Sequence, residues 1–318
     1  MAVSGAEVRP ESYSALVVSA MRAVHSRYGP DPLINDPYGL DLLSDEEQVA
    51  MAKRVADKLT KMGFRRADGA GLVGLPLESI LRAHPSYGNV VLRTCYTDDR
   101  LEEAQKRGVT QLVLLGAGLD TFVLRRPDLA ERLQVFEVDH PASQRMKRRR
   151  LAAAGLAAPP SVTYLSVDFE LQSVGEALEA SSCDPAKPTF FSWLGVSPYL
   201  TLQAHEETLG SIADFFTGDV ELAFNYVRKR GPGDAAATVR PSKVDNGEPI
   251  ISYFDPSEVR ALLAGCGYDV IEDLGAEELG QRYCKMRRDG LRAAATFRMV
   301  HARKAEASDY PSTFWPRR

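Results

Sequence analysis

A short apolar segment that runs into two glycines and an acidic residue carries the clearest chemical information in this 318-residue chain. Leu112–Leu115 is apolar throughout, Gly116 and Gly118 flank Ala117, and Asp120 follows. Glycines at these positions let the backbone turn tightly and approach a flat or charged ligand closely. The pattern predicts the first strand-to-helix turn of a doubly wound α/β sheet, where such folds bind nucleotides. A Gly-x-Gly turn alone does not specify which nucleotide.

Acidic residues also end the next two predicted strands. Asp139 follows Leu133–Val138 and lies about 20 residues beyond the glycine turn, the spacing at which a carboxylate accepts hydrogen bonds from ribose hydroxyls. Asp168 and Phe169 end the third strand, where a side chain would lie over the adenine and Asp168 could accept a hydrogen bond from its amine. An alternative for Asp139 is that it caps a helix beginning at Pro141.

Two candidate ligands fit an adenosine site, a nicotinamide dinucleotide and S-adenosylmethionine. A dinucleotide needs room for a pyrophosphate at the helix N-terminus, usually through Gly-x-Gly-x-x-Gly. Here Thr121 takes the place of the third glycine, and Asp120 puts negative charge where the phosphates would lie. A sulfonium with an α-amino group tolerates a nearby carboxylate, so the electrostatics favour S-adenosylmethionine. A nicotinamide-dependent oxidoreductase stays the alternative enzyme.

The elements that must position these residues alternate between short apolar runs and amphipathic helices. The predicted strands are Gln111–Leu115, Leu133–Val138, Val162–Leu165, Thr189–Trp193, Val220–Tyr226, Tyr268–Glu272 and Ala293–Ala302. The predicted helices among them are Pro141–Ala154, Leu171–Ala180, Leu202–Thr217 and Pro256–Ala264. Connections of this length imply parallel pairing. We therefore expect an α/β fold with a doubly wound, mostly parallel seven-stranded sheet, and an antiparallel hairpin formed by the last two strands at its edge.

The first third of the chain shows helical periodicity instead. Helices are expected at Tyr13–Arg27, from a cap at Ser44 to about Met62, and at Val90–Arg107. We divide the chain into an N-terminal helical cap with cofactor-anchoring helices (1–107) and a Rossmann-like core (108–318), which together form one continuous unit. Residues 229–249 are rich in glycine, proline and small residues, and they are either a lid over the site or a disordered connector.

Composition excludes several classes of protein. Hydrophobic residues make up 44% and charged residues 26%, values that are ordinary for a globular protein. The net charge of −4 argues against a nucleic-acid partner, and the basic run 147–150 is interpreted as a solvated helix face. No apolar run is long enough to span a membrane, and the four cysteines and five histidines form no metal-ligand pattern. We expect a soluble cytoplasmic protein without a metal; its oligomeric state stays open.

Several motifs in order resemble the leucine carboxyl methyltransferase family, and most closely its bacterial branch of tetracenomycin-type polyketide O-methyltransferases. The resemblance covers most of the chain. It is carried by Met21-Arg22-Ala23, DPLINDPY (31–38), RTCYTDD (93–99), LVLLGAGLDT (112–121), VFEVDHPASQRMK (135–147), YFDP (253–256) and RYCKMRRDG (282–290). The ordered set is more specific than any one motif.

This resemblance implies a class I methyltransferase fold, S-adenosylmethionine as cofactor, and roles for particular residues. Arg93 would pair with the carboxylate of the methionine moiety and Arg22 would assist, unless Arg22 belongs to a structural ion pair instead. Gly116 and Gly118 would approach the methionine portion, Asp139 the ribose, and Asp168 with Phe169 the adenine. The full set of predicted cofactor-binding residues is Arg22, Arg93, Gly116, Ala117, Gly118, Asp120, Asp139, His140, Asp168, Phe169 and Trp193.

The resemblance also implies methyl transfer to a small-molecule oxygen, either a carboxylate or a hydroxyl of a polyketide-like metabolite. Candidates for the acceptor pocket are Tyr199, Trp193 and His140, although core packing or helix capping would explain each of them equally well. One position departs from the family pattern, because Leu194 stands where an acidic residue is usual after the fourth strand. That departure leaves open a protein that binds S-adenosylmethionine without transferring its methyl group.

Overall fold

The computed structural model describes residues 13–168, 172–231 and 250–305, which form a seven-stranded sheet with helices on both faces. The strand order is β3-β2-β1-β4-β5-β7-β6. The strands are β1 (Gln111–Leu115), β2 (Gln134–Asp139), β3 (Val162–Ser166), β4 (Thr189–Trp193), β5 (Val220–Val227), β6 (Tyr268–Leu274) and β7 (Phe297–Lys304). The first five pair in parallel, and β7 is antiparallel to both β5 and β6. The expected doubly wound α/β sheet and the antiparallel edge hairpin are therefore confirmed.

Each face of the sheet has its own hydrophobic core. In β1, Leu112 and Leu114 face one core while Val113 and Leu115 face the other, as the alternation of side chains along a strand requires. All five β1 residues are buried, which explains the continuous apolar run Leu112–Leu115 in the sequence.

The helices divide between the two faces of the sheet. The first core is covered by α1 (Tyr13–Tyr28), α2 (Asp45–Lys61), α3 (Leu77–Arg82), α4 (Tyr87–Lys106), α5 (Phe122–Arg125), α6 (Pro127–Ala130), α7 (Pro141–Ala153) and α11 (Ala276–Tyr283). The second core is covered by α8 (Val174–Glu179), α9 (Leu202–Phe215) and α10 (Pro256–Gly265). Two short 3-10 helices, η1 (Pro37–Leu40) and η2 (Ser197–Tyr199), complete the described elements.

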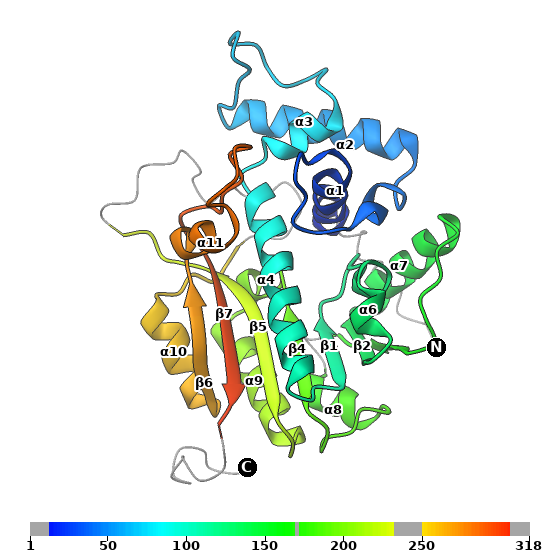
Figure 1. Cartoon of the computed structure of the whole chain (residues 1–318), viewed down its shortest axis with the longest axis vertical. Helices are drawn as coiled ribbons and strands as arrows, with labels where there is room; N and C mark the ends of the chain where they lie inside the picture. Colours follow the sequence, from blue (N-terminus) through cyan, green and yellow to red (C-terminus); the bar gives the residue numbers. More distant parts are fainter. Residues whose placement is uncertain (1–12, 169–171, 232–249, 306–318) are drawn as a thin grey trace, which may run out of the picture.

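The helices α1, α2 and α3 lie over the carboxyl ends of the parallel strands, at the top of Figure 1, whereas α4 runs along the face of the sheet. The predicted cap of α2 is present, because Ser44 Oγ accepts the Glu47 N–H and the Glu47 carboxylate accepts the Ser44 N–H. Ala15 of α1 lies against Gly118, since a side-chain carbon on that glycine would come within 3.6 Å of Ala15 Cβ. The cap and the glycine turn are therefore in direct contact. The division at residues 107 and 108 stays a prediction, and most of residues 229–249 lie outside the described residues.

The structure corrects the interpretation of the basic run 147–150 as a solvated helix face. Lys147 and Arg150 are buried, whereas Arg148 and Arg149 are exposed, so only half of this run is a solvated face. The Lys147 ammonium lies 2.6 Å from the Glu137 carboxylate of β2. Arg150 donates to the carbonyl of Leu42 and pairs with Glu47 of α2. The cause is the position of α7, which turns Lys147 towards β2 and Arg150 towards the start of α2.

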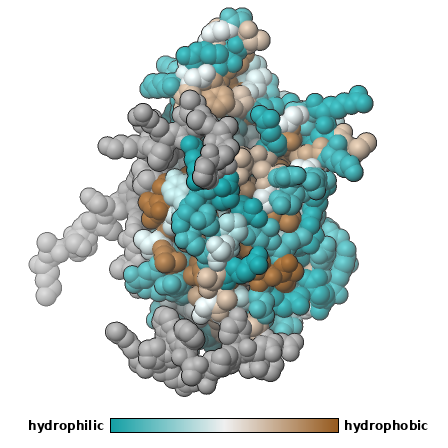
Figure 2. Space-filling model, turned by 90° about the vertical axis from the view of Figure 1, so that its left-hand side faces the viewer, coloured by the Kyte–Doolittle hydropathy of each residue, from teal (hydrophilic) through white to brown (hydrophobic). Residues whose placement is uncertain are grey.

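No helix in the described parts of the chain is both long and apolar enough to cross a membrane. On the face shown in Figure 2, hydrophilic residues predominate and the hydrophobic patches are small and separate.

Candidate functional site

The glycine turn leaves β1 at the carboxyl edge of the sheet. Gly116 and Gly118 have φ angles of +67° and +49°, a region that favours glycine. The Gly116 N–H donates to the carbonyl of Val138 at 2.8 Å. A side-chain carbon on Gly116 would lie 2.3 Å from Cγ2 of Val196. Gly116 is thus required both by the backbone conformation and by the space available, and its neighbour Ala117 is buried.

Asp139 joins the end of β2 to this turn. Its Oδ2 accepts the Gly118 N–H at 2.5 Å and its Oδ1 accepts the His140 N–H at 2.7 Å. Burial raises the pKa of the Asp139 carboxyl, while these two backbone N–H groups act in the opposite direction. The alternative that Asp139 caps the next helix is wrong, because His140 is the capping residue of α7.

His140 and Asp168 lie together at the carboxyl ends of β2 and β3. His140 Nδ1 accepts the Ala142 N–H at 3.1 Å, so a neutral imidazole carries its proton on Nε2. That nitrogen lies 3.8 Å from Asp168 Oδ2, which is beyond hydrogen-bond distance. Both side chains are partly exposed beside Asp139. Phe169, predicted to contact the adenine, lies outside the described residues.

Arg93 projects from α4 towards the loop after β4. Gly195 in that loop has φ +75°, and a side-chain carbon there would lie 2.8 Å from Nη1 of Arg93. The Gly195 N–H donates to Asn225 Oδ1 of β5 at 2.8 Å, which holds the loop in place. Burial and the neighbouring Arg22 lower the pKa of Arg93 to about 10, so its guanidinium stays charged at neutral pH.

Asp120 faces the same region with the opposite charge. Its Oδ1 accepts the Phe122 N–H at 2.6 Å. Burial opposes ionisation, but Arg125 and Arg22 outweigh it and the pKa of Asp120 is lowered. Arg93 and Asp120 interact electrostatically, yet within the described residues neither takes part in an ion pair and Arg93 forms no hydrogen bond. A guanidinium and a carboxylate that are near but not paired suit a zwitterion placed between them.

The structural ion pair considered for Arg22 is present. Its Nε donates to Asp36 Oδ2 at 2.7 Å, and its Nη2 donates to the carbonyl of Leu119 at 2.7 Å. A direct contact between Arg22 and a cofactor stays a prediction.

The acceptor-pocket candidates occupy different environments. Trp193 is 1% exposed, and its ring packs 5.4 Å from that of His205 and 5.7 Å from that of Phe224. This burial leaves no surface of Trp193 for a ligand, so we do not retain it in the proposed site. Tyr199 ends η2, is partly exposed, and interacts electrostatically with Arg93.

Four residues beside the site were not singled out from the sequence: Asp36, Thr121, Gly195 and Asn225. Asp36 lies in the quoted motif 31–38 and Gly195 follows Leu194, the position that departs from the family pattern, but no spacing rule connects them with Arg22 or Arg93 across the fold. Thr121 was considered only as a replacement for glycine. For Asn225 the sequence did offer an indication of a role at the site, because a polar side chain on a buried strand is unusual.

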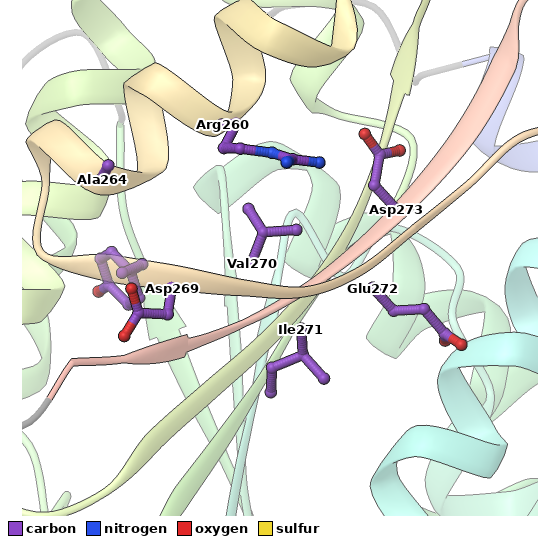
Figure 3. Close-up of a pocket in the computed structure, with 8 residues that line it drawn as sticks. Arg260, Ala264, Asp269, Val270, Ile271, Glu272 and Asp273 are labelled. Carbon is purple, nitrogen blue, oxygen red and sulfur yellow. The ribbon is translucent and has the colours of Figure 1, made fainter.

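Two surface hollows lie away from this site. One, of about 330 Å³, is formed where α10 faces the edge strand β6, and its charged lining includes Arg260, Asp269 and Asp273 (Figure 3). Charges on an edge strand commonly prevent pairing with other chains. The other, of about 560 Å³, lies between α2 and α3 and is lined mainly by apolar side chains. Neither of these two hollows includes the glycine turn or Arg93.

Comparisons with known proteins agree with this geometry. A family model described as leucine carboxyl methyltransferase matches residues 15–213. A Bacillus subtilis (strain 168) protein named "Putative S-adenosyl-L-methionine-dependent methyltransferase YktD" is 30% identical over 301 residues, which cover 92% of this chain and 98% of that protein. Rv3399 of Mycobacterium tuberculosis (strain H37Rv) has the same kind of name and is 29% identical, with coverage of 83% and 75%.

Similar solved structures are more distant. The mitomycin 7-O-methyltransferase MmcR is 19% identical with a TM-score of 0.43, covering 83% of this chain and 74% of that one. The magnesium protoporphyrin IX methyltransferase ChlM of Synechocystis PCC 6803, solved with bound SAM, is 11% identical with a TM-score of 0.41, covering 81% and 97%. Similarities of this size do not bear on the substrate.

Proposed function

The chain belongs to the leucine carboxyl methyltransferase family, and from this premise we propose that it methylates an oxygen atom of a small molecule. It is an S-adenosylmethionine-dependent methyltransferase, so the nicotinamide-dependent alternative and the non-methylating alternative are not retained. The proposed acceptor is a carboxylate or a hydroxyl of a polyketide-like metabolite, and the proposed location is the cytoplasm.

The nearness of Arg93 and Asp120, which carry opposite charges but form no ion pair with each other, is the observation that best supports a site for the cofactor's amino-acid end. The guanidinium of Arg93 would bind the α-carboxylate, and Asp120 would bind the α-ammonium. Leu194 stands where the family pattern usually has an acidic residue, so Asp120 is the carboxylate that we assign to the α-ammonium.

The residues at the ends of β2 and β3 fit the other end of the cofactor. Asp139 keeps lone pairs for the ribose hydroxyls after it has accepted the two backbone N–H groups. Asp168, beside His140, would accept from the adenine amine. When bound, the cofactor supplies an electrophilic methyl group on a sulfonium. The protein's own task is to place the acceptor oxygen in line with that group and to exclude water.

A carboxylate acceptor suits the ionisable groups around the site. A carboxylate is already ionised at neutral pH and needs no general base, whereas a hydroxyl acceptor must lose a proton. Among the candidates, His140 accepts the Ala142 N–H through Nδ1, so in the neutral ring Nε2 carries the proton and cannot accept another. The Ser197–His205 pair, 2.8 Å apart, is buried with exposed fractions of 1% and 0%, so it belongs to the core. We therefore place carboxylates first and hydroxyls second.

Calorimetry with S-adenosylmethionine and S-adenosylhomocysteine, followed by a methyl-transfer assay on small carboxylic acids and phenols, tests the proposal. We expect both nucleosides to bind and carboxylates to be methylated preferentially. Methylation of phenols alone would overturn the preference for carboxylates. If neither nucleoside binds, the cofactor site itself is wrong.

Asp139→Ala is the sharpest variant for the adenosine half. We expect S-adenosylhomocysteine binding to weaken by about 1–3 kcal/mol, roughly 5- to 150-fold, because ribose hydroxyls lose their acceptor. Asp139→Asn keeps the size and one acceptor oxygen, so a smaller loss is expected. Equal affinity of wild type and a folded Asp139→Ala variant would show that Asp139 serves only the glycine turn.

A further inference from the structure

A buried polar cluster joins the N-terminal cap to the residues after the glycine turn. Asp36 Oδ2 accepts both the Arg22 Nε–H at 2.7 Å and the Thr121 hydroxyl at 2.6 Å. Arg22 also donates to the carbonyl of Leu119 at 2.7 Å. The exposed fractions of Arg22, Asp36 and Thr121 are 5%, 0% and 1%. We call these three residues the Asp36 cluster.

The Asp36 cluster holds the backbone on both sides of Asp120. Leu119 is held through its carbonyl and Thr121 through its hydroxyl, so the residue between them has little freedom. Asp120 itself accepts the Phe122 N–H through Oδ1, which fixes the direction of its carboxylate. Arg22 lies close enough to both Asp120 and Arg93 to lower the pKa of each.

A contribution to the stability of the fold does not by itself account for the Asp36 cluster. A buried ion pair contributes little net stability, because desolvation offsets the attraction between the charges. The remaining carboxylate oxygen, Asp36 Oδ1, is buried and has no hydrogen-bond partner within the described part of the chain. Leaving such an oxygen unsatisfied costs free energy. The arrangement is therefore better suited to fixing a geometry than to stabilising the fold.

We propose that Arg22, Asp36 and Thr121 are positioning residues that hold Asp120 where it binds the α-ammonium of the cofactor. Arg22 then acts through Leu119 and Asp36, not by contacting the cofactor carboxylate. The charges around the amino-acid end balance, since Arg22 and Arg93 are opposed by Asp36 and Asp120. This inference rests on the proposed function, because it assumes that the cofactor's amino-acid end lies between Arg93 and Asp120.

Two ligands separate a positioning role from a general structural one. S-adenosylhomocysteine carries the amino-acid end, whereas 5′-methylthioadenosine has the same adenosine and sulfur without it. We expect Thr121→Val to weaken S-adenosylhomocysteine binding by about 10-fold, since the hydroxyl that ties Thr121 to Asp36 is lost. The affinity for 5′-methylthioadenosine should stay within about 2-fold. Thr121→Ser keeps the hydroxyl and should restore the wild-type ratio of the two affinities.

Two further variants complete the calorimetric test. Asp36→Asn removes the charge that Arg22 requires and should change the ratio in the same direction. Thr189→Val is the matched control, because Thr189 is a fully buried threonine whose hydroxyl is hydrogen-bonded at the amino end of β4, at the end of the strand opposite to the site. It should lower the melting temperature and leave the ratio unchanged.

The outcomes distinguish the two proposals. If folded Thr121→Val loses affinity for both ligands equally, the Asp36 cluster only supports the turn and the positioning role is wrong. If wild type binds 5′-methylthioadenosine as tightly as S-adenosylhomocysteine, the amino-acid end is not bound between Arg93 and Asp120, and the assignment of that pair fails with it. If wild type binds neither ligand, the cofactor site fails as a whole.

Discussion

A side chain added to a glycine would have different consequences at different positions of this chain. Gly116 combines a positive φ with a clash against Val196, and Gly195 combines a positive φ with a clash against the Arg93 guanidinium. Gly63 also has a positive φ of +94°, but nothing lies within 4 Å of its added carbon. The comparison separates backbone strain, which all three share, from displacement of a particular neighbour.

Gly195→Ala should therefore weaken cofactor binding more than its cost in stability explains. The new methyl group would push the Arg93 guanidinium away from the carboxylate of the cofactor. We expect binding of S-adenosylhomocysteine to weaken by about 1–3 kcal/mol, the effect of losing a charged hydrogen bond. Gly63→Ala is the control, because it has the strain of a positive φ without the displacement. Equal affinities in the two variants would exclude a direct role for Arg93.

Among the helices and strands, the sequence predicted those whose residue pattern depends on local structure. β1 and β4 match their predicted bounds, because strands buried on both faces are short, largely apolar runs in the sequence. The short helices α3, α5 and α6 were not predicted, since helices of four to six residues depend on tertiary packing. β7 was predicted to begin at Ala293 but begins at Phe297, because the preceding segment packs on α4, where Asn89 Oδ1 accepts the Ala294 N–H.

The site divides in the same way. Asp139 ends β2, and Gly116 and Gly118 follow β1, so their positions could be predicted from the sequence. The partners of Arg22 and Arg93 could not. Asp36 meets Arg22 through packing within the cap, whereas Thr121 meets Asp36 and Gly195 meets Arg93 only through the packing of the cap on the core. Sequence spacing does not encode contacts of this kind. Trp193 lies in the second core, on the opposite face of the sheet, where its ring packs against His205 and Phe224.

A buried ion pair fixes α4, which carries Arg93, against α5 after the glycine turn. Arg125 Nη2 donates to Asp98 Oδ1 at 3.0 Å, and the two side chains are 4% and 9% exposed. Asp98→Ala should lower the free energy of unfolding by about 3–5 kcal/mol, since it leaves an unpaired buried charge. Asp128→Ala removes an aspartate that pairs with Arg126 but is 60% exposed, and should cost about 1 kcal/mol or less. Urea denaturation measures both, and equal losses would contradict the burial argument.

For the whole molecule, the cap and the core share one continuous interior. The first hydrophobic core contains Val24 of α1 and Met51 of α2 together with Leu112 and Ala223 of the sheet. Loss of the cap would therefore expose one face of the sheet as well as remove Arg22 and Asp36 from the site. Cofactor binding and stability of the cap should accordingly change together.

His25 makes this coupling sensitive to acid. It is 1% exposed, its Nε2 accepts the Leu33 N–H at 2.9 Å, and its Nδ1 lies 3.1 Å from the Tyr87 hydroxyl. Burial, together with Arg287 and Arg82, lowers its pKa to about 4, although Asp289 and Asp31 act in the opposite direction. Protonation would remove the acceptor of the Leu33 N–H, so the folded cap requires the neutral imidazole.

The direction of the pH dependence follows from this pKa. The folded-state value lies below the unfolded value near 6.5, so the unfolded chain binds the proton first. His25 thus stabilises the fold fully above pH 6.5, and on the order of 3 kcal/mol is lost as the pH falls from 6.5 to 4. Thermal unfolding of wild type and His25→Gln between pH 7 and 4 measures this loss. We expect the variant to be less stable at pH 7 but to lose less stability on acidification. In the variant, exchange of the Leu33 amide hydrogen should show little of the pH dependence that protonation of His25 causes in wild type. Parallel pH profiles for the two proteins would show that another group controls the acid sensitivity of the cap.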